Sequence, residues 1–176
     1  TRRLKNNASR IVVSGHRGGK YDYENSLSCF KLAIEKGINE IEFDVWLTKN
    51  SIPIVLRGEE DKIGFENSGA GIRKTDKIVD LTLDQIKSIT LPNGESIPTF
   101  EELLTVCQGS GVRMNVEIKD PNIEICQIVA DLLEEYEFSE ESYCFSSFEH
   151  QTLKELKRIN PDFEVGYLYW HLDNMD

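Results

Sequence analysis

Short apolar runs alternate along this chain with longer segments of helical periodicity. The runs that predict strands span residues 11–13, 41–47, 53–56, 112–118, 143–145 and 165–169. Predicted helices span residues 26–36, 81–89, 99–107, 123–136 and 150–159. A regular order of strand, helix, strand, helix is typical of a parallel α/β sheet, since each helix returns the chain to the same edge. The turn-like residues Lys49-Asn50-Ser51 make the strand at 53–56 one arm of a hairpin.

Leaving out that hairpin arm, the sequence predicts five repeating strands. An eight-stranded α/β barrel needs roughly 250 residues, and this chain has 176. We therefore expect an incomplete barrel, whose later strands come from further chain or from another subunit. An open sheet of this kind is expected to expose apolar edges and faces. Residues 58–80 are polar and contain glycine, so they are interpreted as a loop excursion.

Composition excludes several classes of function. The net charge of -11 argues against a nucleic-acid partner, because such binding depends on clustered Lys and Arg. No apolar run approaches the roughly 18 residues of a membrane-spanning helix. The four cysteines form no Cys-x-x-Cys pair, so buried reduced thiols and an intracellular, cytoplasmic location are expected. Residues 1–10 form a basic extension with no acidic residue. Such a segment also suits the end of a mitochondrial transit peptide, which makes a mitochondrial location the alternative to a cytoplasmic one.

Carboxylates interrupt two of the apolar strands. Glu42 and Asp44 are two residues apart, so their side chains share one face of their strand, and Glu117 can join them from the next strand. Buried carboxylates cost several kcal/mol unless they are paired or bound to a metal. Oxygen ligands favour Mg²⁺ or Ca²⁺. The alternative is an acidic rim that pairs with Lys119 and Arg17.

Five motifs occur in an order that resembles the glycerophosphodiester phosphodiesterases. The first is His16-Arg17-Gly18-Gly19 followed by Glu24-Asn25-Ser26, and the second is Glu42-Phe43-Asp44-Val45-Trp46-Leu47-Thr48-Lys49. The others are Val79-Asp80-Leu81-Thr82-Leu83, Ile97-Pro98-Thr99-Phe100-Glu101-Glu102 and Asn115-Val116-Glu117-Ile118-Lys119. Together they extend from about residue 11 to 168. The resemblance implies that residues 11–176 are the first part of a TIM barrel of the phosphodiesterase type, with an insertion at about 58–97.

The resemblance also implies an activity and its residues. The family hydrolyses glycerophosphodiesters to glycerol 3-phosphate and an alcohol, in phospholipid metabolism, with a divalent metal. Carried over by position, the metal ligands are Glu42, Asp44 and Glu117. His16 is an acid–base histidine, Arg17 and Lys119 lie at the substrate phosphate, and Glu24 supports the site.

One position departs from the family pattern in a way that bears on catalysis. Arg57 stands where the second catalytic histidine is expected, after the hairpin strand. Arginine holds a phosphate but keeps its proton, so it cannot act as a general acid or base. Losing one such partner costs about 10²- to 10⁴-fold in rate. His150 and His171 are the remaining candidates for a substitute acid.

Two functional hypotheses follow. The first is a metal-dependent phosphodiesterase, impaired by Arg57, that takes a small glycerophosphodiester. The second is a catalytically inactive barrel that serves as a structural or accessory subunit, with a protein partner covering its open end. Phe148 and Trp170 are candidates for lining a pocket for the alcohol, although aromatic residues at strand ends more often belong to a core.

Overall fold

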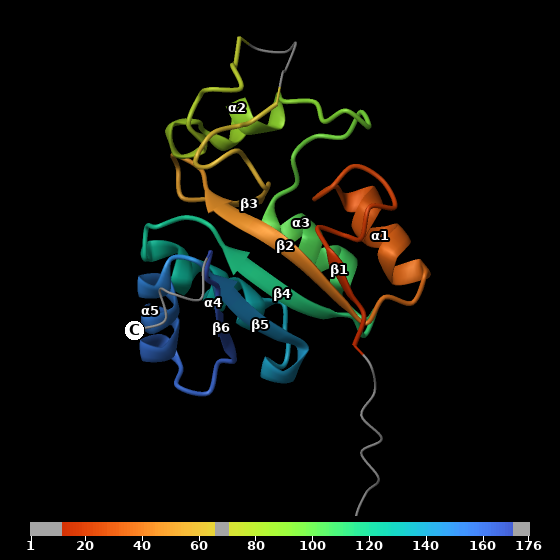
Figure 1. The fold of residues 1–176 in the computed structure, drawn as a ribbon, viewed down its shortest axis with the longest axis vertical. Helices are drawn as coiled ribbons and strands as arrows, with labels where there is room; N and C mark the ends of the chain where they lie inside the picture. Colours follow the sequence, from red (N-terminus) through yellow and green to blue (C-terminus); the bar gives the residue numbers. More distant parts are fainter. Residues whose placement is uncertain (1–11, 66–70, 171–176) are drawn as a thin grey trace, which may run out of the picture.

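A computed structural model describes residues 12–65 and 71–170 of the chain. Its sheet has the order β1-β2-β4-β5-β6, and these strands run parallel. They span Ser14–His16, Glu40–Leu47, Arg113–Ile118, Tyr143–Ser147 and Val165–Tyr167. Strand β3, Pro53–Val55, pairs antiparallel with β2 as the predicted hairpin arm. Within the described residues the sheet stays open, with β1 and β6 at its edges (Figure 1).

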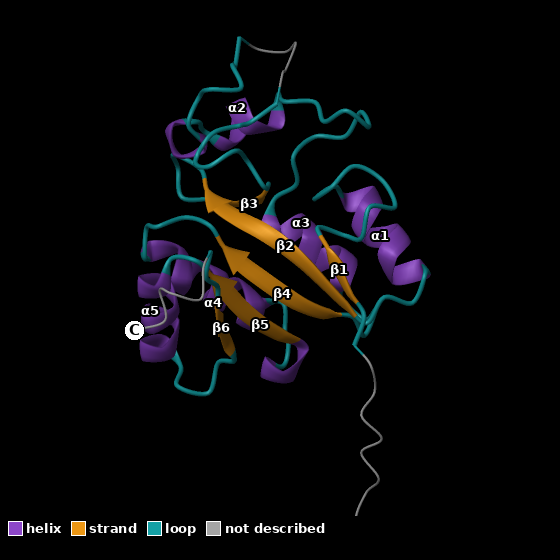
Figure 2. Cartoon of the chain, viewed as in Figure 1, coloured by secondary structure: helices purple, strands orange, loops and turns teal. Residues whose placement is uncertain are grey.

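Helices cover one face of this sheet (Figure 2). They are α1, α3, α4 and α5, at Leu27–Glu35, Phe100–Cys107, Glu124–Glu135 and His150–Ile159. Ser26 and Thr99 cap the first two through their side chains, which fixes where these helices begin. A short helix α2, Leu83–Lys87, and two 3₁₀ turns, η1 at Ile78–Asp80 and η2 at Glu140–Ser142, complete the described elements. No helix in the described part of the chain is long and apolar enough to cross a membrane.

The two faces of the sheet differ completely in chemistry. The outer face, which the helices cover, carries Phe43, Val45 and Val116, all fully buried in one hydrophobic cluster. The inner face carries polar side chains, because parallel register aligns residues of the same parity. Asp44 lies opposite Glu117, which lies opposite Ser146. The expectation of an exposed apolar face is therefore wrong for the inner face, which is polar.

The segment after β3 is a loop excursion whose apolar residues are packed. Residues between 63 and 97 form a second hydrophobic cluster with Trp46, Ile54 and Leu56 from the hairpin. Its members from the segment share a β-branched or leucine side chain: Ile63, Ile72, Ile78, Leu81, Ile86, Ile89, Leu91 and Ile97. These apolar residues are spread thinly among polar ones, so the sequence shows no clear period. The described residues of 58–77 form no helix or strand, as the loop interpretation expects, and the 3₁₀ turn at 78–80 and the apolar packing are the parts that it did not predict. The predicted basic extension at 1–10 lies outside the described residues.

Candidate active site

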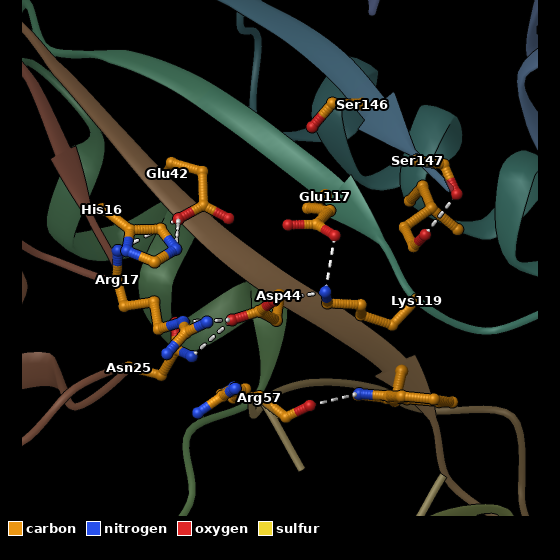
Figure 3. Close-up of polar contacts among 12 residues, drawn as sticks. His16, Arg17, Asn25, Glu42, Asp44, Arg57, Glu117, Lys119, Ser146 and Ser147 are labelled. Carbon is orange, nitrogen blue, oxygen red and sulfur yellow. Dashed lines mark hydrogen bonds and ion pairs between the residues drawn. The ribbon is translucent and has the colours of Figure 1, made fainter. Parts of the chain in front are cut away.

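Three carboxylates meet on the inner face near the carboxyl ends of the strands. Glu42 and Asp44 come from β2, and Glu117 comes from β4 (Figure 3). One oxygen atom from each lies within 4.8 Å of the others. Strand parity predicted this convergence, and the parallel register of β2 with β4 produces it. In parallel α/β folds, this end of the strands is where functional groups gather.

The three carboxylates are buried and incompletely satisfied. Asp44 is fully buried, and Glu42 and Glu117 are each 7% exposed. One oxygen of each accepts no hydrogen bond, namely Glu42 Oε1, Asp44 Oδ1 and Glu117 Oε1. Burial and the charge of Asp44 raise the pKa of Glu42 to about 8, although a hydrogen bond from the Arg17 backbone opposes the shift. Without a bound metal ion, the three carboxylates therefore repel one another, and Glu42 holds its proton more tightly than an ordinary carboxyl does.

Two cations lie against the same carboxylates. Lys119 Nζ is 3.2 Å from Asp44 Oδ1 and 2.5 Å from Glu117 Oε1, at ion-pair distance without the geometry of a hydrogen bond to either oxygen. Arg17 Nε lies 3.4 Å from Asp44 Oδ2, and its Nη1 donates to Glu24 Oε2 at 2.9 Å. Burial alone would lower the pKa of both cations, but the carboxylates outweigh it and raise the pKa of each. The acidic rim paired with Lys119 and Arg17 is thus present, and it coexists with the convergent carboxylates.

A tight loop after β1 places His16 and Arg17 over this group. Arg17 adopts φ 53° and Gly18 adopts φ 89°, and the Arg17 backbone N–H donates to Glu42 Oε2 at 3.0 Å. A Cβ on Gly18 would lie 2.8 Å from Cys29 Sγ, so only glycine fits there. His16 Nε2 is 3.7 Å from Glu42 Oε2, and its side chain is 66% exposed. The imidazole therefore faces open space beside the carboxylates.

Two buried polar residues of the site were missed by sequence reasoning. Asn25, with φ 57°, donates from Nδ2 to Asp44 Oδ2 at 2.9 Å. Asp120 is 1% exposed and accepts from the backbone N–H of Leu47 at 3.0 Å, which joins the loop after β4 to the end of β2. Asn25 lies inside a quoted motif, so its buried amide could have been suspected. For Asp120, the sequence contains no indication of a role except its position next to Lys119.

Arg57 lies two residues after the end of β3, next to a backbone contact with β2. The backbone N–H of Leu56 donates to the Asp44 carbonyl at 3.0 Å, and Trp46 Nε1 donates to the Arg57 carbonyl at 3.2 Å (Figure 3). The Arg57 side chain is exposed and lines two neighbouring cavities of about 310 and 720 Å³. The larger cavity is also lined by Lys119, Phe148 and Trp170.

Neither remaining histidine is shown to replace the missing one. His150 begins α5, and its Nε2 lies 2.9 Å from the Leu168 carbonyl oxygen. Its ring packs edge-on against Tyr167 and Tyr169. These contacts give His150 a structural partner. His171 lies outside the described residues.

The arrangement suits a divalent cation and a phosphate. Three buried carboxylates with unsatisfied oxygens match the ligands that Mg²⁺ and Ca²⁺ prefer, and a cation would displace the proton of Glu42. Arg17 and Lys119 supply positive charge next to that position. An open parallel α/β sheet with these groups at its carboxyl edge has the charges that binding of a cation and a phosphate requires.

Comparisons with known proteins identify the family. Residues 16–173 match the model of the glycerophosphoryl diester phosphodiesterase family. A glycerophosphodiester phosphodiesterase of Caldanaerobacter subterraneus is 33% identical over 183 residues, covering 93% of this chain and 71% of the relative. One of Bacillus altitudinis is 31% identical, covering 89% of this chain and 65% of the relative. The chain belongs to the glycerophosphoryl diester phosphodiesterase family.

A solved structure extends the comparison to the fold. An Oleispira antarctica phosphodiesterase, determined in complex with its product sn-glycerol-3-phosphate, has a TM-score of 0.78 and 25% identity to this chain. The match covers 89% of this chain and 65% of the other protein. The present chain thus spans about two thirds of the length of the relatives that it matches. The TIM-barrel assignment is confirmed, with the described strands forming an open portion of the barrel.

Proposed function

We propose that this protein hydrolyses glycerophosphodiesters to glycerol 3-phosphate and an alcohol. The observation that carries the proposal is the convergence of Glu42, Asp44 and Glu117 beside His16 in a chain of this family. The product bound to the Oleispira relative has the same chemistry. Residues 11–176, with the insertion at 58–97, are proposed to form one such domain. The four free cysteines favour a reducing, intracellular compartment.

The side chains of this protein have distinct proposed roles. Glu42, Asp44 and Glu117 would hold Mg²⁺ or Ca²⁺. The cation, when bound, would neutralise charge on the phosphate oxygens. Arg17 and Lys119 hold the phosphate by charge, and Glu24 keeps the Arg17 guanidinium in place through its 2.9 Å hydrogen bond. His16 takes the proton from the attacking hydroxyl, since its exposed imidazole borders this position.

Arg57 sets the expected level of activity. It lines the cavities beside the carboxylates but keeps its proton, so the site has one acid–base imidazole in the described structure. A deficit of about 10²- to 10⁴-fold against alkyl diesters is expected. Catalysis is therefore proposed to be impaired and not abolished.

A second candidate function rests on the same departure. A catalytically inactive barrel could serve as a structural or accessory subunit. Arg57 favours this alternative, together with the two edge strands, β1 and β6, each of which pairs with a strand on one side only within the described residues. A protein partner would then cover the open side of the barrel. Such a partner is expected to remain bound through purification and to involve residues near β6.

The experiment is a paired measurement of metal binding and hydrolysis on the full-length protein. Calorimetric titration with Mg²⁺ and with Ca²⁺ measures affinity, and release of glycerol 3-phosphate measures turnover. Asp44→Asn is expected to weaken metal binding at least about 100-fold, because a buried ligand charge is lost. Asp162→Asn is the matched control, since Asp162 is exposed and far along the chain. Turnover should fall in parallel with metal affinity in Asp44→Asn alone.

The outcomes separate the two candidates. Metal binding with glycerol 3-phosphate release supports the hydrolase. Metal binding without release from any glycerophosphodiester, at high enzyme concentration, supports the inactive barrel. No metal binding by the wild-type protein contradicts the assignment of the three carboxylates.

A further inference from the structure

Among the described residues, Arg57 is the one cation of the site that has no carboxylate partner. Arg17 pairs with Glu24 and Asp44, and Lys119 pairs with Asp44 and Glu117. For Arg57, the described part of the chain provides neither a side-chain hydrogen bond nor an ion pair. Glu59 and Glu60 line the larger cavity beside Arg57, but neither forms an ion pair with it. An unpaired guanidinium that opens into two cavities can bind an anion that comes from the substrate.

The leaving group is the part of the substrate that lacks a proton donor in this site. When a phosphodiester is cleaved, the departing oxygen must either take a proton or leave as an anion. His16 lies at the carboxylates and is already needed as the base. His150 is bound to the Leu168 carbonyl. Arg57 cannot donate a proton, but it can stabilise a negative oxygen. An arginine at this position therefore favours leaving groups that depart as stable anions.

The residues that line the larger cavity indicate the chemical class of the leaving group. Phe148 and Trp170 stack with ring centroids 4.3 Å apart and planes at 16°, and Trp170 is 78% exposed. Trp46 and Pro121 line the same cavity of about 720 Å³, which also contains Arg57. An exposed aromatic surface next to a cation suits a flat aromatic group that carries a negative oxygen.

We infer that this protein, if it is a phosphodiesterase as proposed above, is specific for aryl phosphodiesters over alkyl ones. In the step, the oxygen of water attacks phosphorus and gives its proton to His16. The bond between phosphorus and the aryl oxygen breaks, and its electron pair leaves on that oxygen as an aryloxide beside Arg57. The products are a phosphomonoester and an aryloxide, which solvent protonates to the phenol, while His16 returns its proton to solvent. A tyrosine-like phenol has a pKa of about 10, whereas that of water, which simple alcohols resemble, is about 15.7.

The test measures how rate depends on the acidity of the leaving group. The full-length protein is assayed with glycerophosphodiesters of substituted phenols and of simple alkanols, with Mg²⁺ or Ca²⁺, as wild type and as Arg57→His, Arg57→Gln and Arg73→His. Arg73 is the matched control, because it is exposed in the insertion and lines neither cavity. In the wild type, log kcat/KM should fall steeply as the pKa of the leaving group rises.

Arg57→His should raise kcat/KM for alkyl esters by about 10²- to 10⁴-fold and flatten the dependence, because an imidazole can protonate the leaving oxygen. Arg57→Gln should lower kcat/KM for aryl esters by roughly 10- to 100-fold, because the charge facing the aryloxide is lost. Arg73→His should leave both series unchanged. Arg57 is exposed, so none of these variants removes packed core, and thermal unfolding checks that each is folded.

Other results overturn the inference and separate it from the proposed function. If the wild type cleaves alkyl and aryl esters equally, with a flat dependence, another group donates the proton and only the inference fails. Glu59 is the first candidate in that case, because it lines both cavities, and Glu59→Gln would then produce the steep dependence. If no ester of either series is cleaved while metal binds, the hydrolase itself is contradicted.

A second variant tests the aromatic wall. Trp170→Ala should raise KM for aryl esters by about 2- to 10-fold and change KM for alkyl esters less, because only aryl groups stack on the indole. Ile123→Ala is the control, since Ile123 is also an exposed apolar residue but lies outside the cavity. An equal change for both series would remove the stacking contribution from the inference.

Discussion

The same strands present opposite chemistry on the two faces of the sheet. On β2, Phe43 and Val45 are fully buried under the helices, while Glu42 and Asp44 lie on the inner face. The outer face is satisfied by packing with the helices. The inner face keeps carboxylate oxygens that accept no hydrogen bond. One face therefore stabilises the fold, and the other carries an electrostatic cost that Arg17 and Lys119 offset only in part.

This contrast places the larger hydrophobic core on one side of the sheet. Helices α1, α3, α4 and α5 bury that apolar side, so this core lies between helices and sheet and not in the barrel interior. The insertion adds a second cluster against the hairpin. Polar residues such as Asn115 and Ser146, which share a 2.8 Å hydrogen bond, occupy the inner face instead of the stacked apolar layers of many barrels.

The largest expected effect comes from exchanging one residue on each face. Phe43→Ala should lower the free energy of unfolding by about 3–5 kcal/mol, because it removes a fully buried ring that contacts Phe30 and Phe100. Asp44→Asn, one residue later, should change stability less, since it removes a charge that repels Glu42. Urea unfolding of both metal-free variants makes the comparison. A larger loss for Asp44→Asn would show that the inner face also supports the fold.

Much of this two-sided arrangement is visible in the sequence. The alternation of Ile41 to Leu47 predicted which residues share a face, and the helix at 150–159 is observed at His150–Ile159. Period and parity are local properties, so a single sequence contains them. The convergence of Glu42 with Glu117 also follows, once β2 and β4 are neighbours.

Other features depend on contacts that no local pattern reports. The amide of Asn25 reaches Asp44 across 19 residues, and Asp120 reaches the Leu47 backbone across 73. Glu95 caps the first turn of α1 through Leu27 N–H, which ties the insertion to the loop that carries Arg17. Sequence reasoning treated most of the insertion as a loop, because its apolar residues pack against a hairpin far along the chain.

A smaller effect tests whether the outer helices owe their positions to capping. Thr99 accepts from the Glu102 backbone N–H at 3.1 Å, and Glu102 accepts in return from the Thr99 backbone N–H at 2.8 Å. Thr99→Ala should lower the free energy of unfolding by about 1 kcal/mol. Thr105→Ala, on the exposed side of the same helix, is the control. Because α3 packs only on the outer face, metal affinity should stay unchanged. A change in metal affinity would break the separation of the two faces.

The smallest effect uses cysteines as reporters of the two faces. Burial raises the pKa of Cys107, on outer helix α3, to about 12, and raises that of the half-buried Cys144, on β5, to about 11. Since the thiolate is the reactive form, both should alkylate at pH 8 at least about 100-fold more slowly than a free thiol of pKa about 8.5. The alkylation rate of Cys144 should rise about tenfold for each unit of pH, because its side chain is partly open to solvent. The alkylation rate of Cys107 should instead equal the rate at which the protein unfolds. Mass spectrometry of alkylated peptides measures both rates.

The same pKa shifts fix the direction of the stability change with pH. A native thiol whose pKa is raised holds its proton more tightly than the unfolded chain does, so its contribution is fully present below the unfolded pKa of about 8.5. That contribution is lost as pH rises toward about 11 and 12, where the native thiols ionise. Cys107→Ser should reduce the loss of stability between pH 8.5 and 10, because the serine hydroxyl does not ionise there. If the stability of Cys107→Ser depends on pH as that of the wild type does, Cys107 is more accessible to solvent than its packing on the outer face requires.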